Sequence, residues 1–428
     1  MSALRPAVLA LLAALLIAAV LGASAFAAGP GYDRSFGHGG RHPLTPVKPP
    51  GVHKLEYREW LGAIDGAVYV LATSECPGCG NRGTFLFRFL RGGRFDASFG
   101  GHGYAKLPAG EGGLRLAVDA RGRALVSGQA DDVQVRRYTR GGRPDPRFGH
   151  RGVVGLPKFG RELLANAPTV TPMFAGGLLV SSETPAEGHG FARLRLAELH
   201  EDGAPVRAFG HDGVTTVDAA GAFHLESGPT VLRDGSILIG AEGCCTERVS
   251  LTRVSARGRL DTRYDQAARR ALRPLAALRE RSVEGTELNA IIPRREGGVD
   301  LFGFASPHGF EVRIKGNGQA DTRFGRRGLK VLPLPVSTAT AIPGGGFFVA
   351  GNEFNQQSVA YVVRGDGSAD RRFRPAALGS GSFYPQATVL AGGEASIVYG
   401  RQIKNAANFQ YRPVVAHFVL PAVPGTGR

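Results

Sequence analysis

A short sequence phrase, Gly-x-x-Asp-x-x-Phe-Gly, recurs along this chain and constrains its fold more than any other feature. The phrase reads GRFDASFG from residue 93, GRPDPRFG from residue 142 and GQADTRFG from residue 318. Its aromatic position is occupied seven times, by Phe36, Phe99, Phe148, Phe209, Tyr264, Phe324 and Phe373. An aspartate lies three residues earlier in six copies, at Asp33, Asp96, Asp145, Asp261, Asp321 and Asp370, whereas Val206 replaces it in the remaining copy. The mean spacing of about 56 residues predicts seven structural repeats of one kind.

The segments between the phrases predict four β-strands in each repeat. A β-rich run that ends in small residues recurs, as in AVYVLATS at 67–74 and GFFVAGNE at 346–353. An Asp-Gly or Gly-Gly turn usually precedes this run and predicts a hairpin with the strand before it. A second run follows, alternating in several repeats, and a short third run comes after the phrase. We therefore predict an all-β fold, a seven-bladed β-propeller of four-stranded antiparallel blades.

The two ends of the chain predict how the ring closes. The segment GYDRSFGHGG at 31–40 is the end of a repeat with no hairpin before it, and PVVAHFVL at 413–420 is an outer strand with no phrase after it. Together the two segments complete one blade, which leaves no free sheet edge. An open solenoid would instead need capping units. We expect a ring closed by the N- and C-terminal segments.

The first residues predict export. Arg5 is followed by an apolar run at 7–21, and Ala25 and Ala27 form the small-x-small pattern of a signal-peptidase site. We predict a signal peptide at 1–27 and a single propeller domain at 28–428, secreted or extracytoplasmic in the cell envelope. The alternative is an N-terminal anchor that is not cleaved, because the run and its flank approach membrane-spanning length. We expect no transmembrane segment after cleavage, and a monomer.

Read as Gly-x-x-Asp-x-x-Phe-Gly-x-x-Gly after an outer strand, the phrase resembles the delta-60 repeat of secreted bacterial β-propellers. The resemblance covers residues from about 31 to 420. The phrases lie near 33–40, 96–103, 145–152, 206–213, 261–268, 321–328 and 370–377. The resemblance implies an architecture, and the family carries no agreed catalytic residues to transfer.

The invariant positions of the phrase have a structural interpretation. An Asp before a tight turn accepts hydrogen bonds from backbone N–H groups two or three residues later. The aromatic residue would fill the space between adjacent blades, and the Gly residues would supply positive-φ positions. A residue that recurs in every repeat is expected to be architectural, because a catalytic residue needs to occur only once.

The variable positions after the phrase aromatic are the candidate ligand-binding residues. They hold His38, His102, His150, Arg151, His211, Asp212, Arg326 and Arg327. We expect the chain to cross toward the channel here, so that these residues face one another at the channel mouth and bind an anionic ligand. The alternatives are exposed polar turn residues or a metal site. We expect no metal, because no carboxylates accompany the histidines at ligand spacing.

Four cysteines form two close pairs, Cys76 with Cys79 and Cys244 with Cys245. In an exported protein an even number of cysteines usually indicates disulfides, so we predict a local bond within each pair. Free thiols are the first alternative and metal binding is the second.

One stretch departs from the β pattern. Residues 265–287 are rich in Ala, Leu and Arg with roughly helical apolar spacing, interrupted by Pro274, and predict a short inserted helix on the rim of the fifth repeat.

The remaining sequence predicts a binding protein. We find no hydrolase, metalloprotease or nucleotide-binding motif in a suitable context. The net charge of +16 is scattered rather than clustered, so we expect no specific nucleic-acid binding and no cofactor. The hypothesis is an exported, non-catalytic binding or scaffold module whose ligand is a protein, a glycan or an anionic envelope polymer. The alternative is a secreted hydrolase or lyase with its site at the channel mouth.

Overall fold

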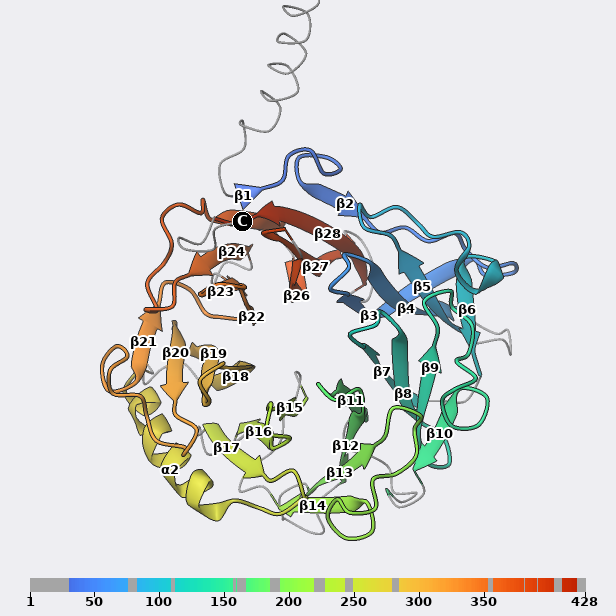
Figure 1. Cartoon of the computed structure of the whole chain (residues 1–428). Helices are drawn as coiled ribbons and strands as arrows, with labels where there is room; N and C mark the ends of the chain where they lie inside the picture. The colour runs from blue at the N-terminus through green and yellow to red at the C-terminus, as the bar shows by residue number, and fades with distance from the viewer. Residues whose placement is uncertain are drawn as a thin grey trace, which may run out of the picture.

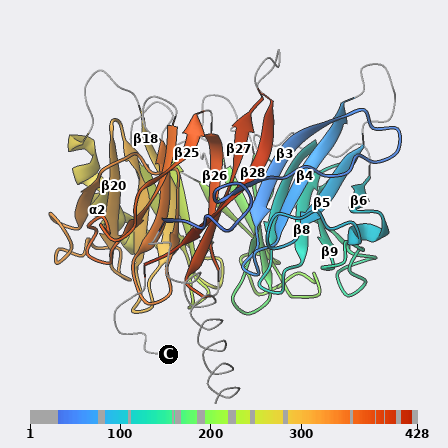
Figure 2. The same cartoon turned by 90° about the horizontal axis from the view of Figure 1, so that it is seen from above.

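The computed structural model describes residues 31–75, 83–108, 112–156, 159, 167–184, 193–218, 228–242, 249–278, 285–352, 357–380, 382–390, 392–403 and 410–421. Seven antiparallel sheets stand around a central axis in this part of the chain (Figure 1). Their strands run between the two faces of the ring (Figure 2). The predicted seven-bladed β-propeller is confirmed. Within the described ranges, no helix has the length and apolar character needed to cross a membrane.

Six blades are continuous in sequence, and we number them in chain order. Blade 1 contains β3 (Lys54–Gly62), β4 (Val68–Glu75), β5 (Thr84–Phe89) and β6 (Tyr104–Leu107). Blade 2 contains β7 (Gly112–Val118), β8 (Ala124–Gln129), β9 (Val133–Tyr138) and β10 (Val153–Leu156). Blade 3 contains β11 (Thr169–Pro172), β12 (Leu178–Thr184), β13 (Arg193–Leu199) and β14 (Val214–Asp218). Blade 4 contains β15 (Thr230–Val231), β16 (Ile237–Glu242) and β17 (Val249–Val254).

Blade 5 contains β18 (Thr286–Pro293), β19 (Val299–Ala305), β20 (His308–Ile314) and β21 (Leu329–Leu332). Blade 6 contains β22 (Thr338–Ala341), β23 (Phe347–Asn352), β24 (Gln357–Val363) and β25 (Ala376–Ser380). In every blade the first strand faces the axis and the last element lies on the outer perimeter (Figure 1).

Blade 7 joins the two ends of the chain, as the sequence predicts. It contains β26 (Ser382–Leu390), β27 (Glu394–Gln402) and β28 (Tyr411–Val419) from the C-terminal part. Two short N-terminal strands, β1 (Gly31–Tyr32) and β2 (Arg41–Pro43), both pair with β28 and complete its outer edge. The sheet edges of the terminal segments therefore satisfy each other, and the ring is closed by hydrogen bonds.

In the described residues, blade 4 has a helix in place of its outermost strand. Helix α2 (Thr262–Leu272) packs beside β17, and the 3₁₀ helix η3 (Arg273–Ala277) follows it. Asp261, the aspartate of the phrase, is the helix N-cap and accepts a hydrogen bond from the Tyr264 amide at 3.1 Å. The predicted helical stretch of 265–287 is wrong at its C-terminal end, because β18 already begins at Thr286. The helix belongs to blade 4 because its buried face replaces the missing strand, and it is not an insertion on the fifth repeat.

The aspartate of the phrase organises the turn that follows it. The backbone amide two residues later donates to the carboxylate of Asp33, Asp96, Asp145, Asp321 and Asp370 at 3.0–3.4 Å. This local bond holds a tight turn without help from a strand. It explains why the aspartate recurs in the repeats.

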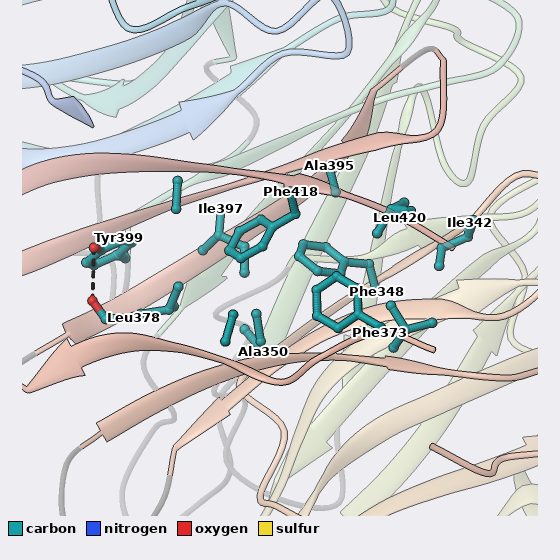
Figure 3. Close-up of a cluster of buried hydrophobic side chains, with 14 of the residues drawn as sticks. Ile342, Phe348, Ala350, Phe373, Leu378, Ala395, Ile397, Tyr399, Phe418 and Leu420 are labelled. Atoms are coloured by element: carbon teal, nitrogen blue, oxygen red, sulfur yellow. Dashed lines mark hydrogen bonds between the residues drawn. The ribbon is translucent and has the colours of Figure 1, made fainter. Parts of the chain in front are cut away.

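The aromatic residues of the phrase lie between blades. All seven are buried, with 0–8% of their surface exposed. Phe99, for example, shares a hydrophobic cluster with Tyr69 of blade 1 and Leu116 of blade 2. Figure 3 shows the equivalent cluster between blades 6 and 7, where the Phe418 ring lies 6.2 Å from Phe373. Burial of such large side chains at each boundary is a major stabilising term for the ring.

Backbone hydrogen bonds join neighbouring blades at several of the joints. The Gly100 amide donates to the Gly141 carbonyl of the next blade at 2.7 Å, and Gly149 donates to Asp202 in the same way. Gly142 sits against this contact with φ of +80°, and a Cβ there would lie 2.5 Å from the Gly100 nitrogen. A glycine is required because the two backbones approach too closely for a side chain.

An arginine reinforces four of the joints, a feature that we did not identify from the sequence. It lies eight residues before the phrase aspartate, on the third strand of the blade, as Arg88, Arg137, Arg253 and Arg313. Each guanidinium group donates to a turn carbonyl of the following blade, those of Arg140, Glu201, Gly316 and Gly365 respectively. In blade 3 the position holds Glu198, and the same repeat lacks the aspartate. In blade 7 it holds His417, which stacks on Phe36 at 3.8 Å.

Candidate functional site

The candidate residues predicted after the phrase aromatic lie on the outer perimeter. The phrase joins the third strand of a blade to its outermost strand, as between β9 and β10 for His150 and Arg151. The first strands, not these turns, surround the axis (Figure 1). The expectation that the chain crosses toward the channel at this point is therefore wrong. The candidates do not face one another across a channel mouth, because the turns that carry them lie on the outer rim of the ring.

Their local geometry is that of a tight exposed turn. The His150 amide donates to the Val153 carbonyl at 2.9 Å, and the turns at His211 and Arg326 repeat this bond at 2.8 Å. The residue that follows each of these three has a positive φ, 52° at Arg151, 59° at Asp212 and 57° at Arg327. His38 and His102 are exposed as well. Among the described residues, no three His, Cys, Asp or Glu side chains gather as metal ligands would.

Two of the candidates, His102 and Arg151, meet in one hollow between blades 1 and 2. The hollow has a volume of about 400 Å³. Three more basic residues, Lys106, Arg136 and Arg143, line it with them, and the buried Arg137 also contributes to the lining. We call the set of His102, Lys106, Arg136, Arg143 and Arg151 the basic groove. Tyr104, Pro108 and Pro144 supply apolar surface to the same hollow.

Strand alternation places the cations of the basic groove. In β6, Ala105 and Leu107 point into the core, so Lys106 between them points outward. In β9, Arg136 is half-buried at the surface and its neighbour Arg137 is buried. Successive side chains of a strand point to opposite faces. Arg136 therefore lies at the surface of the basic groove, whereas Arg137 points into the joint between blades.

Three cations of the basic groove are not neutralised by the described residues around them. Lys106, Arg143 and Arg151 are exposed and form no ion pair with any described residue. The nearby carboxylate of Asp145 is bound to Arg137 at 2.8 Å, beneath the surface. Burial alone would raise the pKa of Asp145, but the Arg147 amide and the Arg137 guanidinium hold that pKa below its ordinary value. Asp145 therefore stays charged and neutralises Arg137, while the exposed cations keep their charge.

The cations of the basic groove are not required by the repeat. The equivalent hollow between blades 2 and 3, of about 470 Å³, is lined by Asp202, Gly203 and Ala204 together with Arg147 and His150. By their spacing from the phrase aromatic, Lys106, Arg136, Arg143 and Arg151 correspond to Gly155, Ala197, Ala204 and Asp212. The second joint forms without any of the four charges. A joint of this kind therefore does not require these four cations, and a comparison of these four positions between repeats is the sequence signal that would have found them.

The other predicted residues lie apart from the basic groove. His150 lines the hollow between blades 2 and 3, and His211 lies on the rim of blade 3. His38 belongs to blade 7, and Arg326 and Arg327 to blade 5. The four cysteines, Cys76, Cys79, Cys244 and Cys245, lie outside the described residues, so both disulfides stay predictions.

Comparison with known proteins adds the following findings. No protein-family profile and no curated protein matches the chain, so membership of the delta-60 repeat family stays a prediction. Among solved structures, the chain is similar to the polysaccharide lyase Uly1, with 11% identity, a TM-score of 0.44, and coverage of 90% of this chain and 93% of that one. A Dyadobacter fermentans protein of unknown function has 12% identity and a TM-score of 0.41 over 89% of this chain and 100% of its own. An acylaminoacyl peptidase of Pyrococcus horikoshii has 9% identity and a TM-score of 0.46, over 88% of this chain and 54% of its own. At these scores the similarities support no conclusion about activity.

Proposed function

We propose that this protein is an exported binding module that holds an acidic glycan of the cell envelope in the basic groove. The observation that carries the proposal is the convergence of one lysine, three arginines and one histidine at the surface of one hollow, whose lining includes no carboxylate among the described residues. A surface of one sign attracts ligands of the opposite sign and concentrates them locally. The net charge of +16 extends the same attraction over the whole molecule.

The form of the basic groove fits a polymer of sugar acids. The groove is open at the outer perimeter, so a chain can enter and leave it without threading through the ring. Arginine guanidinium groups bind carboxylates through paired hydrogen bonds, which suits the carboxylates of uronic acids. Tyr104 and the two prolines offer apolar surface to the carbon face of a sugar ring.

The groups of the basic groove favour binding over catalysis. Hydrolysis or elimination of a glycan needs an acid and a base held within reach of the same bond. The groove presents guanidinium and ammonium groups together with one imidazole and two tyrosine hydroxyls, and its described lining lacks the carboxylate pair that glycan hydrolysis uses. Such a set neutralises an anion and orients it, so a scaffold or binding role is the function that it supports best.

The test is to measure the binding of alginate, a polymer of uronic acids, by isothermal titration calorimetry. In the variant Lys106→Gln, Arg143→Gln, Arg151→Gln we expect the affinity to fall by about tenfold to a hundredfold, because three charge-assisted contacts are lost. The affinity of the unchanged protein should fall steeply with added salt, and that of the variant less steeply, because screening weakens exposed charge pairs.

A variant with the same change in net charge controls for long-range attraction. Arg263, Arg270 and Arg273 are exposed on the helical side of blade 4, and their replacement by Gln leaves the basic groove intact. We expect this control to bind alginate within about twofold of the unchanged protein. Equal losses in the two variants would show that net charge alone attracts the polymer and would contradict the proposal.

A further inference from the structure

A second hollow lies at one mouth of the central channel and is separate from the basic groove. Its volume is about 370 Å³. It is lined by the first turn of blade 3 (Phe174), the first turn of blade 4 (Arg233), and the ends of β18 and β22 in blades 5 and 6. These inner strands surround the axis (Figure 1). Four consecutive blades thus converge on one concave surface, the arrangement in which ligand sites usually form.

The turns around this channel mouth have a similar backbone conformation and differ in one exposed side chain. Each first turn closes with a glycine of positive φ, for example 88° at Gly176, 77° at Gly235 and 87° at Gly297. The position two residues before that glycine varies and holds Ile64, Ala120, Phe174, Arg233, Arg295 and Pro343. Because the turn accepts aliphatic, aromatic, cationic and imino side chains here, the fold does not dictate the choice.

The two arginines of the mouth are free to bind a ligand. Asp234, which follows Arg233, is held by Arg253 at 2.7 Å, and Glu296, which follows Arg295, is bound to Arg294. Each neighbouring carboxylate is therefore occupied by a different arginine. Arg233 and Arg295 are exposed and form no ion pair with any residue in the described ranges.

Apart from the two arginines and Thr340, the residues that line the hollow are apolar. Ile291, Pro293 and Ala341 line it together with Phe174. Phe174 has 71% of its surface exposed, the largest fraction of any large hydrophobic residue in the described part of the chain. An exposed aromatic ring beside an apolar floor costs free energy in water and gains it when a ligand covers the ring.

We propose that the channel-mouth hollow is a second binding site, specific for a small organic acid that combines a carboxylate with an apolar body. Arg233 and Arg295 bind the carboxylate, and Phe174 stacks on the apolar body over Ile291 and Pro293. Paired guanidinium groups match the planar carboxylate, and the apolar floor selects against small hydrated anions. The site does not depend on the function proposed for the basic groove, since the two share no residue.

The test uses 2-naphthoate as the probe and its neutral amide, 2-naphthamide, as a matched ligand, with binding followed by calorimetry. We expect saturable binding of 2-naphthoate at one site and at least about tenfold weaker binding of the amide, because the amide lacks the charge that pairs with arginine. We expect a similar loss of 2-naphthoate affinity in Arg233→Gln, Arg295→Gln, and a loss in Phe174→Ala. Equal affinities for the acid and the amide, or no saturable binding, would overturn the proposal.

Two control variants locate the effect. Ile64→Ala changes the equivalent exposed position in blade 1, outside the hollow, and should bind 2-naphthoate as the unchanged protein does. The basic-groove variant Lys106→Gln, Arg143→Gln, Arg151→Gln should also retain 2-naphthoate binding. A loss of 2-naphthoate affinity in either control would show that the probe binds elsewhere and would refute the channel-mouth site. Failure of alginate to bind would contradict only the function proposed for the basic groove.

Discussion

Replacement of Arg137 by Met is expected to lower the free energy of unfolding by about 3–5 kcal/mol, the typical cost of removing one partner of a buried ion pair. Arg137 is 2% exposed, the largest of the fully buried side chains in the described residues. Its Nε donates to Asp145 at 2.8 Å, and its Nη1 donates to the Glu201 carbonyl of the next blade. The guanidinium also lies 4.5 Å from the centre of the Phe148 ring.

The large effect follows from what the substitution leaves behind. Met fills most of the volume but cannot neutralise Asp145, whose remaining cationic neighbour, Arg123, lies at 3.4 Å. It also leaves the Glu201 carbonyl without this donor. The substitution should therefore weaken the joint between blades 2 and 3.

Urea unfolding, monitored by circular dichroism, tests this expectation. The urea concentrations at the unfolding midpoints are compared between variants whose unfolding free energy has the same dependence on urea. Arg143→Gln removes an exposed arginine from the same blade and should change stability by no more than about 0.5 kcal/mol. The double variant Arg137→Met, Asp145→Asn also removes the carboxylate that the first substitution leaves without its partner. Its loss of stability should therefore be smaller than the sum of the losses in the two single variants. A midpoint for Arg137→Met equal to that of Arg143→Gln would show that the joint does not depend on this arginine.

Replacement of Glu311 by Gln is expected to stabilise the protein at pH 9 by an amount on the order of a few kcal/mol, and to have little effect near pH 5. Glu311 is fully buried in blade 5 and packs beside Asp300, which is 2% exposed. One guanidinium, that of Arg313, serves both carboxylates, with Nε 2.6 Å from Asp300 and Nη2 3.1 Å from Glu311. Burial first, and then the charge of Asp300, raises the pKa of Glu311 to about 8.

The direction of the pH effect follows from this raised pKa. The folded protein holds the Glu311 proton more tightly than the unfolded chain does, since an exposed Glu has a pKa of about 4.3. The contribution to stability is complete below that value and is lost as the pH rises through about 8. Gln cannot ionise and keeps a hydrogen-bond donor, so the variant retains at high pH the stability that the unchanged protein loses.

Thermal and urea unfolding of both proteins between pH 5 and pH 9 measures the difference. Burial raises the pKa of Glu59 to about 7, and this group adds the same decline to both proteins, so the difference reports the pair of Glu311 and Asp300. Glu296→Gln, an exposed substitution in the same blade, should shift the whole profile without changing its slope in this range. Parallel profiles for Glu311→Gln and the unchanged protein would mean that Glu311 is already charged in the folded state at neutral pH.

Much of the architecture can be predicted from the sequence because the repeat is local. Asp96 and Phe99 recur at fixed spacing, and each has a role that short-range geometry explains, a turn for the aspartate and a blade boundary for the aromatic ring. The closing of blade 7 follows from the incomplete repeats at the two ends. The helix of blade 4 could be placed only roughly, because the aspartate of the phrase begins a tight turn in other repeats but is a helix N-cap at Asp261.

The candidate site was predicted only in part. His102 and Arg151 come from variable positions of the phrase, and the structure brings them together with Lys106, Arg136 and Arg143. These residues come from two successive repeats, and only the packing of one blade against the next places them in one hollow. The predicted location at the channel mouth was wrong because alternation along strands does not reveal which end of a blade faces the axis.

The sequence by itself determined the number of blades, their strands and the closure of the ring, because periodic spacing encodes local hydrogen bonding and burial. The tertiary structure alone decided which turns lie on the outer perimeter and which surround the mouth of the central channel. It also decided that Arg137 is buried while its neighbour Arg136 faces the basic groove, and that Asp300 and Glu311 share one guanidinium. These are contacts between strands and between blades, whose energies depend on distances and desolvation that the order of residues does not contain.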